Sequence, residues 1–229
     1  WGAEAIVAFP QWEGMEVPIQ EAIDEGIVVV NFDIEIDADG VYRVTGDNYD
    51  MGVQGAHYIF DKIGADGIVV TLPVPTSGSV SKLRMDGFLD TMAEIDQNWV
   101  LKEYATAFTR EDGLADFADI LVSNPQIDAV YSLDDETSIG VLQAIMEAGR
   151  TDIKVITGGG GCQEYFNMMP DYPDMWVQSA LYSPAMVKEA VKMAVDILNG
   201  EEVESPMVIP TSLVDKDNYE DYLDANSPY

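Results

Sequence analysis

The stretch Gly67–Leu72, GIVVTL, together with the segment Ser79–Ala93 that follows it, decides the fold class. The first run is almost wholly apolar and rich in β-branched side chains, which is typical of strands covered on both faces. The second repeats apolar residues at helical spacing and predicts one buried face. That face comprises Met85, Phe88, Leu89 and Met92. A buried strand followed by an amphipathic helix is the building unit of parallel α/β sheets.

The same alternation extends in both directions along the chain. Further strands are predicted at Glu4–Phe9, Ile27–Phe32, Val41–Val44, Trp99–Tyr104, Ile127–Ser132, Ile153–Thr157 and Trp176–Leu181. Helices are predicted at Val17–Glu25, Asn48–Ile63, Glu111–Ser123, Thr137–Ala148 and Pro184–Leu198. The last has one apolar side, which comprises Met186, Val187, Ala190, Val191, Ala194, Val195 and Leu198. This pattern predicts parallel sheets flanked by helices, in which ligands bind beyond the carboxyl ends of the strands.

The charge balance excludes several classes of partner. Lys and Arg total 11 against 42 Asp and Glu, giving a net charge of −31. Such a surface repels phosphate backbones and anionic lipid, so we expect no nucleic-acid partner. We interpret the charge as a solubilising surface, since no D-x-[DN]-x-[DN]-G loop supports a calcium site. We expect neither a metal nor a cofactor.

The chain offers little machinery for catalysis. It has one cysteine, Cys162, and one histidine, His57, and no G-x-S-x-G motif, so we expect a protein that is not an enzyme. Paired carboxylates at Asp33, Asp134 and Asp135 leave a glycosidase as an alternative. The run Gly158–Gly161 lacks the Lys-Ser/Thr of a phosphate-binding loop. We interpret it as a flexible loop or as a cleft wall without side chains.

Residues that follow the strands are the first candidates for a binding site. Asp33, Phe108, Asp134 and Tyr182 each follow a predicted strand, and Trp12 lies in the loop after the first one. A carboxylate accepts two sugar hydroxyls at once, and an aromatic ring covers the apolar C–H face of a sugar. Each has a plainer alternative: Asp33 caps a loop, Phe108 belongs to the core, and Asp134 caps the next helix.

Six segments carry a family resemblance in their order and spacing. They are AIVAFP at Ala5–Pro10, GDNYDMG at Gly46–Gly52, R-x-x-G-F at Arg84–Phe88, DAVYSLDDETSIG at Asp128–Gly140, EAGRTDIKV at Glu147–Val155 and IPTSLVDKDNY at Ile209–Tyr219. Together they resemble the periplasmic sugar-binding proteins of ABC importers, the ribose-binding-protein-like family. The resemblance covers nearly the whole chain and implies the type I periplasmic binding protein fold, with two Rossmann-like lobes joined by a three-crossing hinge.

The resemblance implies roles for particular residues. Asp33 matches a sugar-binding aspartate, Arg84 a binding arginine (its alternative being a surface or ion-pair role), and Phe108 an aromatic that stacks on the sugar. Asp134 stands where the family usually has a binding Asn. Gly159 and Leu181 replace a binding Asp and a binding Gln, and Ile34 replaces an Arg found in ribose binders. These departures argue against ribose as the ligand.

The resemblance also divides the chain into lobes. It implies an N-terminal lobe of residues 1–46 and 183–209 and a C-terminal lobe of residues 47–182 and 210–229, with crossings near Gly46, Ser183 and Pro210. It further implies about 50 residues, the length of two strand–helix units, before the element that opens this chain. We therefore expect a fragment with an incomplete N-terminal lobe; a rebuilt lobe is the alternative. The opening Trp1-Gly2-Ala3-Glu4 has no basic, apolar leader, which indicates a mature or truncated chain.

The expected function is that of an extracytoplasmic, monomeric substrate-binding protein that delivers a sugar to the membrane permease of an ABC importer. It would be periplasmic or a cell-surface lipoprotein. The effector-binding core of a transcriptional regulator and a ligand-sensing ectodomain are alternatives on the same fold.

Overall fold

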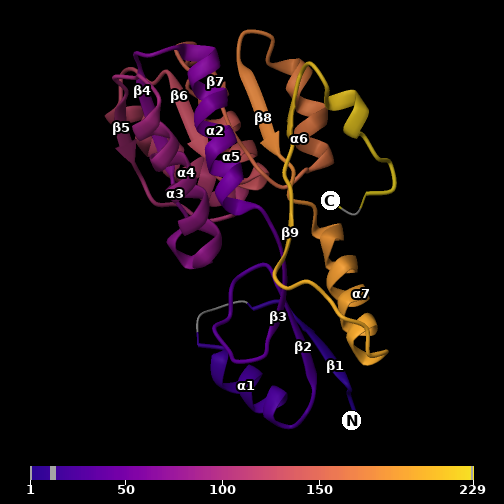
Figure 1. Cartoon of the computed structure of the whole chain (residues 1–229). Coiled ribbons are helices and arrows are strands. Elements are labelled where there is room, and N and C mark those ends of the chain that lie inside the picture. The colour runs from indigo at the N-terminus through magenta and orange to yellow at the C-terminus, as the bar shows by residue number, and fades with distance from the viewer. Residues whose placement is uncertain (1, 11–13, 228) are drawn as a thin grey trace.

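The computed structural model describes residues 2–10, 14–227 and 229 and contains two sheets (Figure 1). The smaller is wholly parallel, in the order β1 (Ala5–Ala8), β2 (Val28–Phe32), β3 (Tyr42–Gly46) and β9 (Met207–Ile209). The larger has the order β10 (Leu213–Asp215), β8 (Trp176–Ala180), β7 (Val155–Ile156), β6 (Ala129–Ser132), β4 (Ile68–Leu72) and β5 (Val100–Glu103). Only β10 runs antiparallel to its neighbour within that sheet. The predicted α/β fold with parallel sheets is confirmed.

Seven helices flank the sheets in the described part of the chain. They are α1 (Glu16–Asp24), α2 (Asn48–Ile63), α3 (Ser79–Glu94), α4 (Arg110–Ser123), α5 (Asp135–Glu147), α6 (Gln163–Met168) and α7 (Val187–Leu198). The predicted elements are all present with shifted ends, whereas α6, β9 and β10 were not expected. Each of these three is six residues or shorter, so none shows a measurable hydrophobic period.

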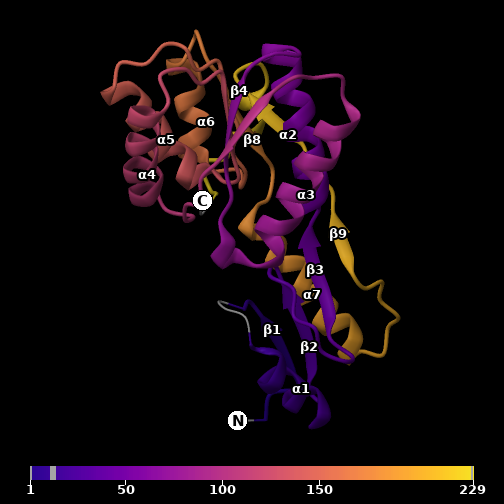
Figure 2. The same ribbon diagram turned by 90° about the vertical axis from the view of Figure 1, so that its left-hand side faces the viewer.

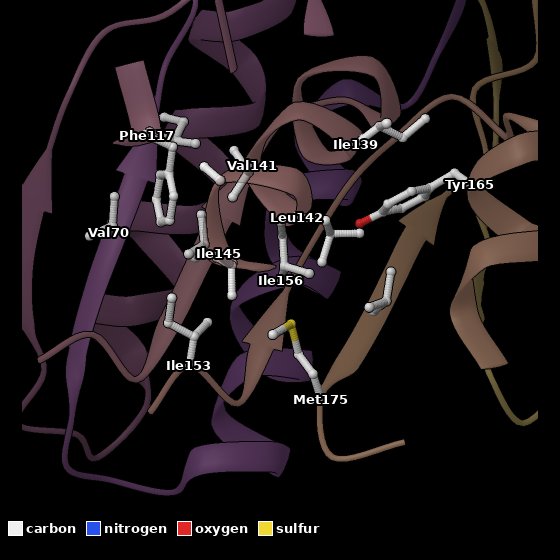
Figure 3. Close-up of a cluster of buried hydrophobic side chains, with 14 of the residues drawn as sticks. Val70, Phe117, Ile139, Val141, Leu142, Ile145, Ile153, Ile156, Tyr165 and Met175 are labelled. Carbon is white, nitrogen blue, oxygen red and sulfur yellow. The ribbon is translucent and has the colours of Figure 1, made fainter. Parts of the chain in front are cut away.

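The larger sheet is buried on both faces because successive residues of its strands pack into two different hydrophobic cores. Val69 packs with α2 and α3, and its neighbour Val70 packs with α4 and α5. The cluster around Val70 also contains Phe117 and Tyr165 (Figure 3). Both valines are 0% exposed, which explains why this strand reads as a continuous apolar run.

The helical faces are narrower than their apolar stripes predicted. In α7, Ala190 and Ala194 are buried, whereas Val191, Val195 and Leu198 are about half exposed, at 51%, 49% and 48%. The helix lies over β1, β2 and β3, and its buried face is turned toward Met193, which is 2% exposed and was not among the residues predicted on the apolar side. Leu89 in α3 is likewise exposed, so its assignment to the buried face of that helix was wrong.

The chain passes between the two sheets three times, after β3, after β8 and after β9. The three passages are hydrogen-bonded to one another. Asp47 N donates to Ile209 O at 2.9 Å, and Leu181 N donates to Ser212 O at 2.9 Å. Both views show the chain passing between the two sheet groups along this line (Figures 1 and 2). Within the described residues, no helix combines the length and apolar character needed to cross a membrane.

Candidate functional site

A cavity of about 290 Å³ lies between the two sheet groups, beyond the carboxyl ends of their strands. Phe9, Phe32 and Asp33 line it from the small sheet, and Arg84, Phe108 and Asp134 from the large one. Tyr182 and Pro184, from the passage after β8, line it as well. A second cavity of about 200 Å³ continues from it and shares Phe9, Asp33, Val80 and Phe108. The two form one cleft whose walls come from both groups.

Asp33 lies directly after β2 in a strained backbone conformation. Its φ of 74° is the one positive value among the described non-glycine residues, a conformation that Asp tolerates better than most residues. Arg43 Nη2 donates to its carbonyl at 3.3 Å, and Tyr182 donates its hydroxyl to Asp33 Oδ1 at 2.6 Å. The carboxylate is therefore held in place while its second oxygen faces the cavity without a hydrogen bond from a described side chain.

Arg84 is a buried cation without a carboxylate partner. Its side chain is 4% exposed, and it forms no ion pair with any carboxylate in the described residues. Nε donates to Asn48 Oδ1 at 2.9 Å, Nη1 donates to Leu133 O at 2.6 Å, and the guanidinium lies 4.9 Å from the centre of the Tyr182 ring. Because Nη2 has no such bond in the described residues, Arg84 keeps a donor for a ligand in the cavity that it lines.

The position of Asp134 is compatible with both roles considered for it, capping of a helix and binding of a ligand. Its Oδ1 accepts from Thr137 N at 2.8 Å and caps the start of α5. Burial raises its pKa, while the Thr137 hydrogen bonds and the Arg84 charge oppose that rise. Its second oxygen has no hydrogen-bond donor among the described residues, so the cap leaves one acceptor for a ligand.

Aromatic rings surround these polar groups. Phe108 is only partly buried against the core and lines both cavities, so the cleft wall and the core share it. Phe9, 51% exposed, lies 6.1 Å from Phe32 between ring centres. We did not expect Phe9 or Phe32 in the site, although Phe9 directly follows β1 and the rule that found Asp33 applies to it.

Of the other positions named from the sequence, some line the cleft and others do not. Trp12 lies outside the described residues. Gly159 lines the larger cavity and Ile34 the smaller one, whereas Leu181 lines neither. Among the described residues, no group of three or more His, Cys, Asp or Glu side chains is placed to hold a metal ion.

Two largely parallel α/β sheets, joined by three passages around a cleft that contains a few charged groups, define a protein of the type I periplasmic binding class. A profile of the periplasmic binding protein domain matches residues 2–202. The chain therefore belongs to the periplasmic binding protein domain family, which is a family of binding proteins.

Individual relatives agree with this assignment. The D-allose-binding periplasmic protein of Escherichia coli is 30% identical over 162 residues, covering 67% of this chain and 52% of that protein. The ribose import binding protein of Bacillus subtilis is 29% identical over 215 residues, 93% of this chain and 68% of the relative. A solute-binding protein of an ABC transporter from Mycobacterium smegmatis, solved with glycerol, superposes with a TM-score of 0.87 at 27% identity and covers 99% of this chain and 79% of that one. The chain thus spans about half the length of the allose-binding relative.

Proposed function

We propose that this chain forms the cleft of an extracytoplasmic substrate-binding protein that captures a neutral sugar or polyol for an ABC importer. The observation that carries the proposal is the buried guanidinium of Arg84, which has no carboxylate partner among the described residues and shares one aromatic-lined cavity with the carboxylates of Asp33 and Asp134. A buried cation is costly unless it is paired or hydrogen-bonded, and a ligand that bonds to Nη2 would satisfy it.

The charges in the cavity favour a neutral ligand. One guanidinium and two carboxylates line it, so a further negative charge is repelled and a positive charge meets Arg84. A sugar presents hydroxyls that accept from Arg84 and donate to Asp33 and Asp134 at the same time. Its C–H faces suit the rings of Phe9 and Phe108. The cavity, about 290 Å³ in volume, is near the lower end of the range for ligand pockets, about 300–1,000 Å³, which favours a monosaccharide.

We propose lobes of residues 1–46 with 183–209, and of residues 47–182 with 210–229. The three passages between sheets lie next to these boundaries, and Asp47–Ile209 and Leu181–Ser212 bonds run between them. A ligand that contacts both walls binds the closed form more tightly and shifts the population toward it.

The ABC importer's membrane permease is the proposed partner, and the binding protein is proposed to act as a monomer outside the cytoplasm, in the periplasm or as a surface lipoprotein. The names of the relatives support transport, and the family supports binding without turnover.

A thermal-shift screen with aldopentoses, aldohexoses, ketohexoses, inositol and linear polyols tests the proposal, followed by calorimetry on each hit. Binding raises the unfolding temperature because the ligand stabilises only the folded state. We expect at least one neutral polyhydroxyl compound to bind and to be recovered unchanged by mass spectrometry. A stabilising amino acid or nucleoside with no sugar response would refute the ligand class, and any turnover would refute the binding role.

A further inference from the structure

Each glycine of the run Gly158–Gly161 leaves room for a specific neighbour. A Cβ on Gly158 would lie 2.5 Å from Asp135 Oδ1, and one on Gly159 would lie 2.6 Å from Met51 Cε. A Cβ on Gly160 would lie 3.0 Å from Tyr229 Cε1 and 3.1 Å from its hydroxyl oxygen. The run is therefore closely packed against its surroundings, and the place of a side chain at Gly160 is taken by the Tyr229 ring.

The Tyr229 ring lies in the wall of the same cleft. Gly159, Gly160 and Tyr229 all line the larger cavity. The C-terminal end of the chain lies at the edge of the larger sheet group that faces the smaller one, in both views (Figures 1 and 2). Residue 229 thus reaches the cleft from the segment after β10, which contains the short 3-10 helix Tyr219–Tyr222 and, in its described residues, no strand.

Specific bonds hold this segment against α6. Gln163 Nε2 donates to Tyr222 O at 3.2 Å, and Gln163 Oε1 accepts from Asp224 N at 2.7 Å. Gln163 N donates to Tyr229 O at 3.3 Å, and Ser227 Oγ donates to the same oxygen at 2.9 Å. One glutamine and one serine therefore fix the main chain on both sides of the last turn and orient the Tyr229 ring toward Gly160.

The Tyr229 hydroxyl keeps its hydrogen-bonding capacity for a ligand. No side chain or main-chain group in the described residues bonds to it. Burial, together with the nearby carboxylates of Asp135 and Asp134, raises the pKa of Tyr229. The hydroxyl is therefore protonated at physiological pH and can donate as well as accept.

We propose that Tyr229 is a ligand-contacting and specificity-determining residue, which adds a phenol hydroxyl and a ring face to the part of the cleft wall that Gly159 and Gly160 leave without side chains. This inference rests on the proposed function. The ligand group it recognises is a hydroxyl or ring oxygen of the bound sugar, on the side away from Phe9 and Phe32.

Calorimetric titration of the best sugar from the screen tests the inference on four variants. We expect Tyr229→Ala to weaken the Kd at least tenfold and Tyr229→Phe to weaken it about fivefold, which is the size of one hydrogen bond. Gly160→Ala should weaken binding less than Tyr229→Ala, because its Cβ would lie 3.0 Å from the Tyr229 ring and moves the ring by only a few tenths of an ångström. Tyr219→Phe, a tyrosine in the same segment whose hydroxyl bonds only to Glu220, should bind as the wild type does.

The outcomes separate the two proposals. A wild-type protein that binds no sugar overturns the proposed function and this inference with it. A wild-type protein that binds, together with Tyr229→Ala of unchanged Kd and unchanged unfolding temperature, overturns the role of Tyr229 alone. If Tyr229→Ala unfolds, Tyr229→Phe decides, since it keeps the ring packing and removes only the hydroxyl.

Discussion

Tyr182 donates its hydroxyl to Asp33 Oδ1 at 2.6 Å and so links the passage after β8 to the end of β2. The same hydroxyl lies 3.2 Å from Thr45 Oγ1, and the ring faces the Arg84 guanidinium. The ring also occupies the space beside Gly46, where a Cβ would lie 2.5 Å from it. Tyr182 therefore contacts two of the three charged groups of the site, Asp33 and Arg84, from the hinge.

Replacing Tyr182 with Phe tests this orienting role. The ring stays against Gly46 and Arg84, but Asp33 loses the donor that holds its carboxylate in a positive-φ residue. We expect sugar affinity to fall about five- to tenfold, corresponding to roughly 1 kcal/mol, with little change in the unfolding temperature. Calorimetry on the wild type and variant measures it. Tighter binding would mean instead that the tyrosine competes with the ligand for Asp33.

Arg84→Lys should reduce affinity more strongly. Lysine keeps the positive charge but loses the planar fork that holds Asn48 and Leu133 while offering Nη2 to the ligand. We expect a loss of about 2 kcal/mol, roughly thirtyfold in Kd. Lys82→Arg, the reverse exchange at an exposed position of the same helix, is the matched control because it also keeps the charge and does not touch the cavity. Equal effects of the two variants would show that the guanidinium of Arg84 has no specific role in binding.

The sequence predicts those site residues that come directly after a predicted strand. Asp33 and Asp134 follow β2 and β6, and parallel strands bring their carboxyl ends to the same edge. Arg84 has no such signal, because it lies inside α3 and only the family resemblance identified it. Tyr229 lies after the last strand and the short 3-10 helix Tyr219–Tyr222, where no hydrophobic period specifies position, so local patterning could not place it in the cleft.

The strands were predicted well because a strand that is buried on both faces consists of a continuous run of apolar residues. Helix faces were predicted less well, because the width of a buried stripe depends on what packs against it. The exposed Val191 and Val195 look identical in sequence to residues that face a core. The backbones of α2 and α3 also come into close contact at Gly52 and Gly87. The hydrophobic period of a helix does not show which other helix will pack against it.

Asp135 predicts a distinct pH dependence of stability. Its carboxyl is fully buried, with Oδ2 accepting from Cys162 N, Gly161 N and the Ser179 hydroxyl, and Oδ1 without a partner. Burial, with a further contribution from the Asp134 charge, raises its pKa to about 7 despite those three bonds. The folded state therefore binds a proton that the unfolded state releases, so stability present below about pH 4 is lost as the pH rises through about 7.

Asp135→Asn isolates this contribution, since the amide oxygen can keep the Oδ2 bonds and the amide does not ionise. We expect the variant to gain stability relative to the wild type between pH 5 and pH 8, with the full pKa shift corresponding to on the order of 4 kcal/mol. Urea unfolding at several pH values measures the difference in the free energy of unfolding between the two proteins. Repulsion among the other acidic groups affects both proteins equally and cancels from this difference. Parallel curves would show that Asp135 has an ordinary pKa.

Gly87→Ala tests the packing that positions Arg84. A Cβ on Gly87 would lie 2.1 Å from Tyr49 O, and one on Gly52 would lie 2.1 Å from Arg84 O, so the backbones of α2 and α3 touch at these glycines. Helix propensity alone predicts that alanine stabilises by about 1 kcal/mol. Overpacking against a main-chain oxygen has no flexible atom to relieve it, and we expect a net loss of about 2 kcal/mol in the free energy of unfolding.

The same substitution should also affect the site, because Gly87 lies one turn from Arg84 on α3. Forcing the helices apart moves the guanidinium away from Asn48 on α2, which holds its Nε. We therefore expect weaker sugar binding in protein that is still folded at low temperature. Ser123→Ala, at an exposed position on α4, is the control and should stay within about 0.5 kcal/mol of the wild type. A stabilised Gly87→Ala protein would show that α2 and α3 are not in backbone contact and that Arg84 is positioned by other means.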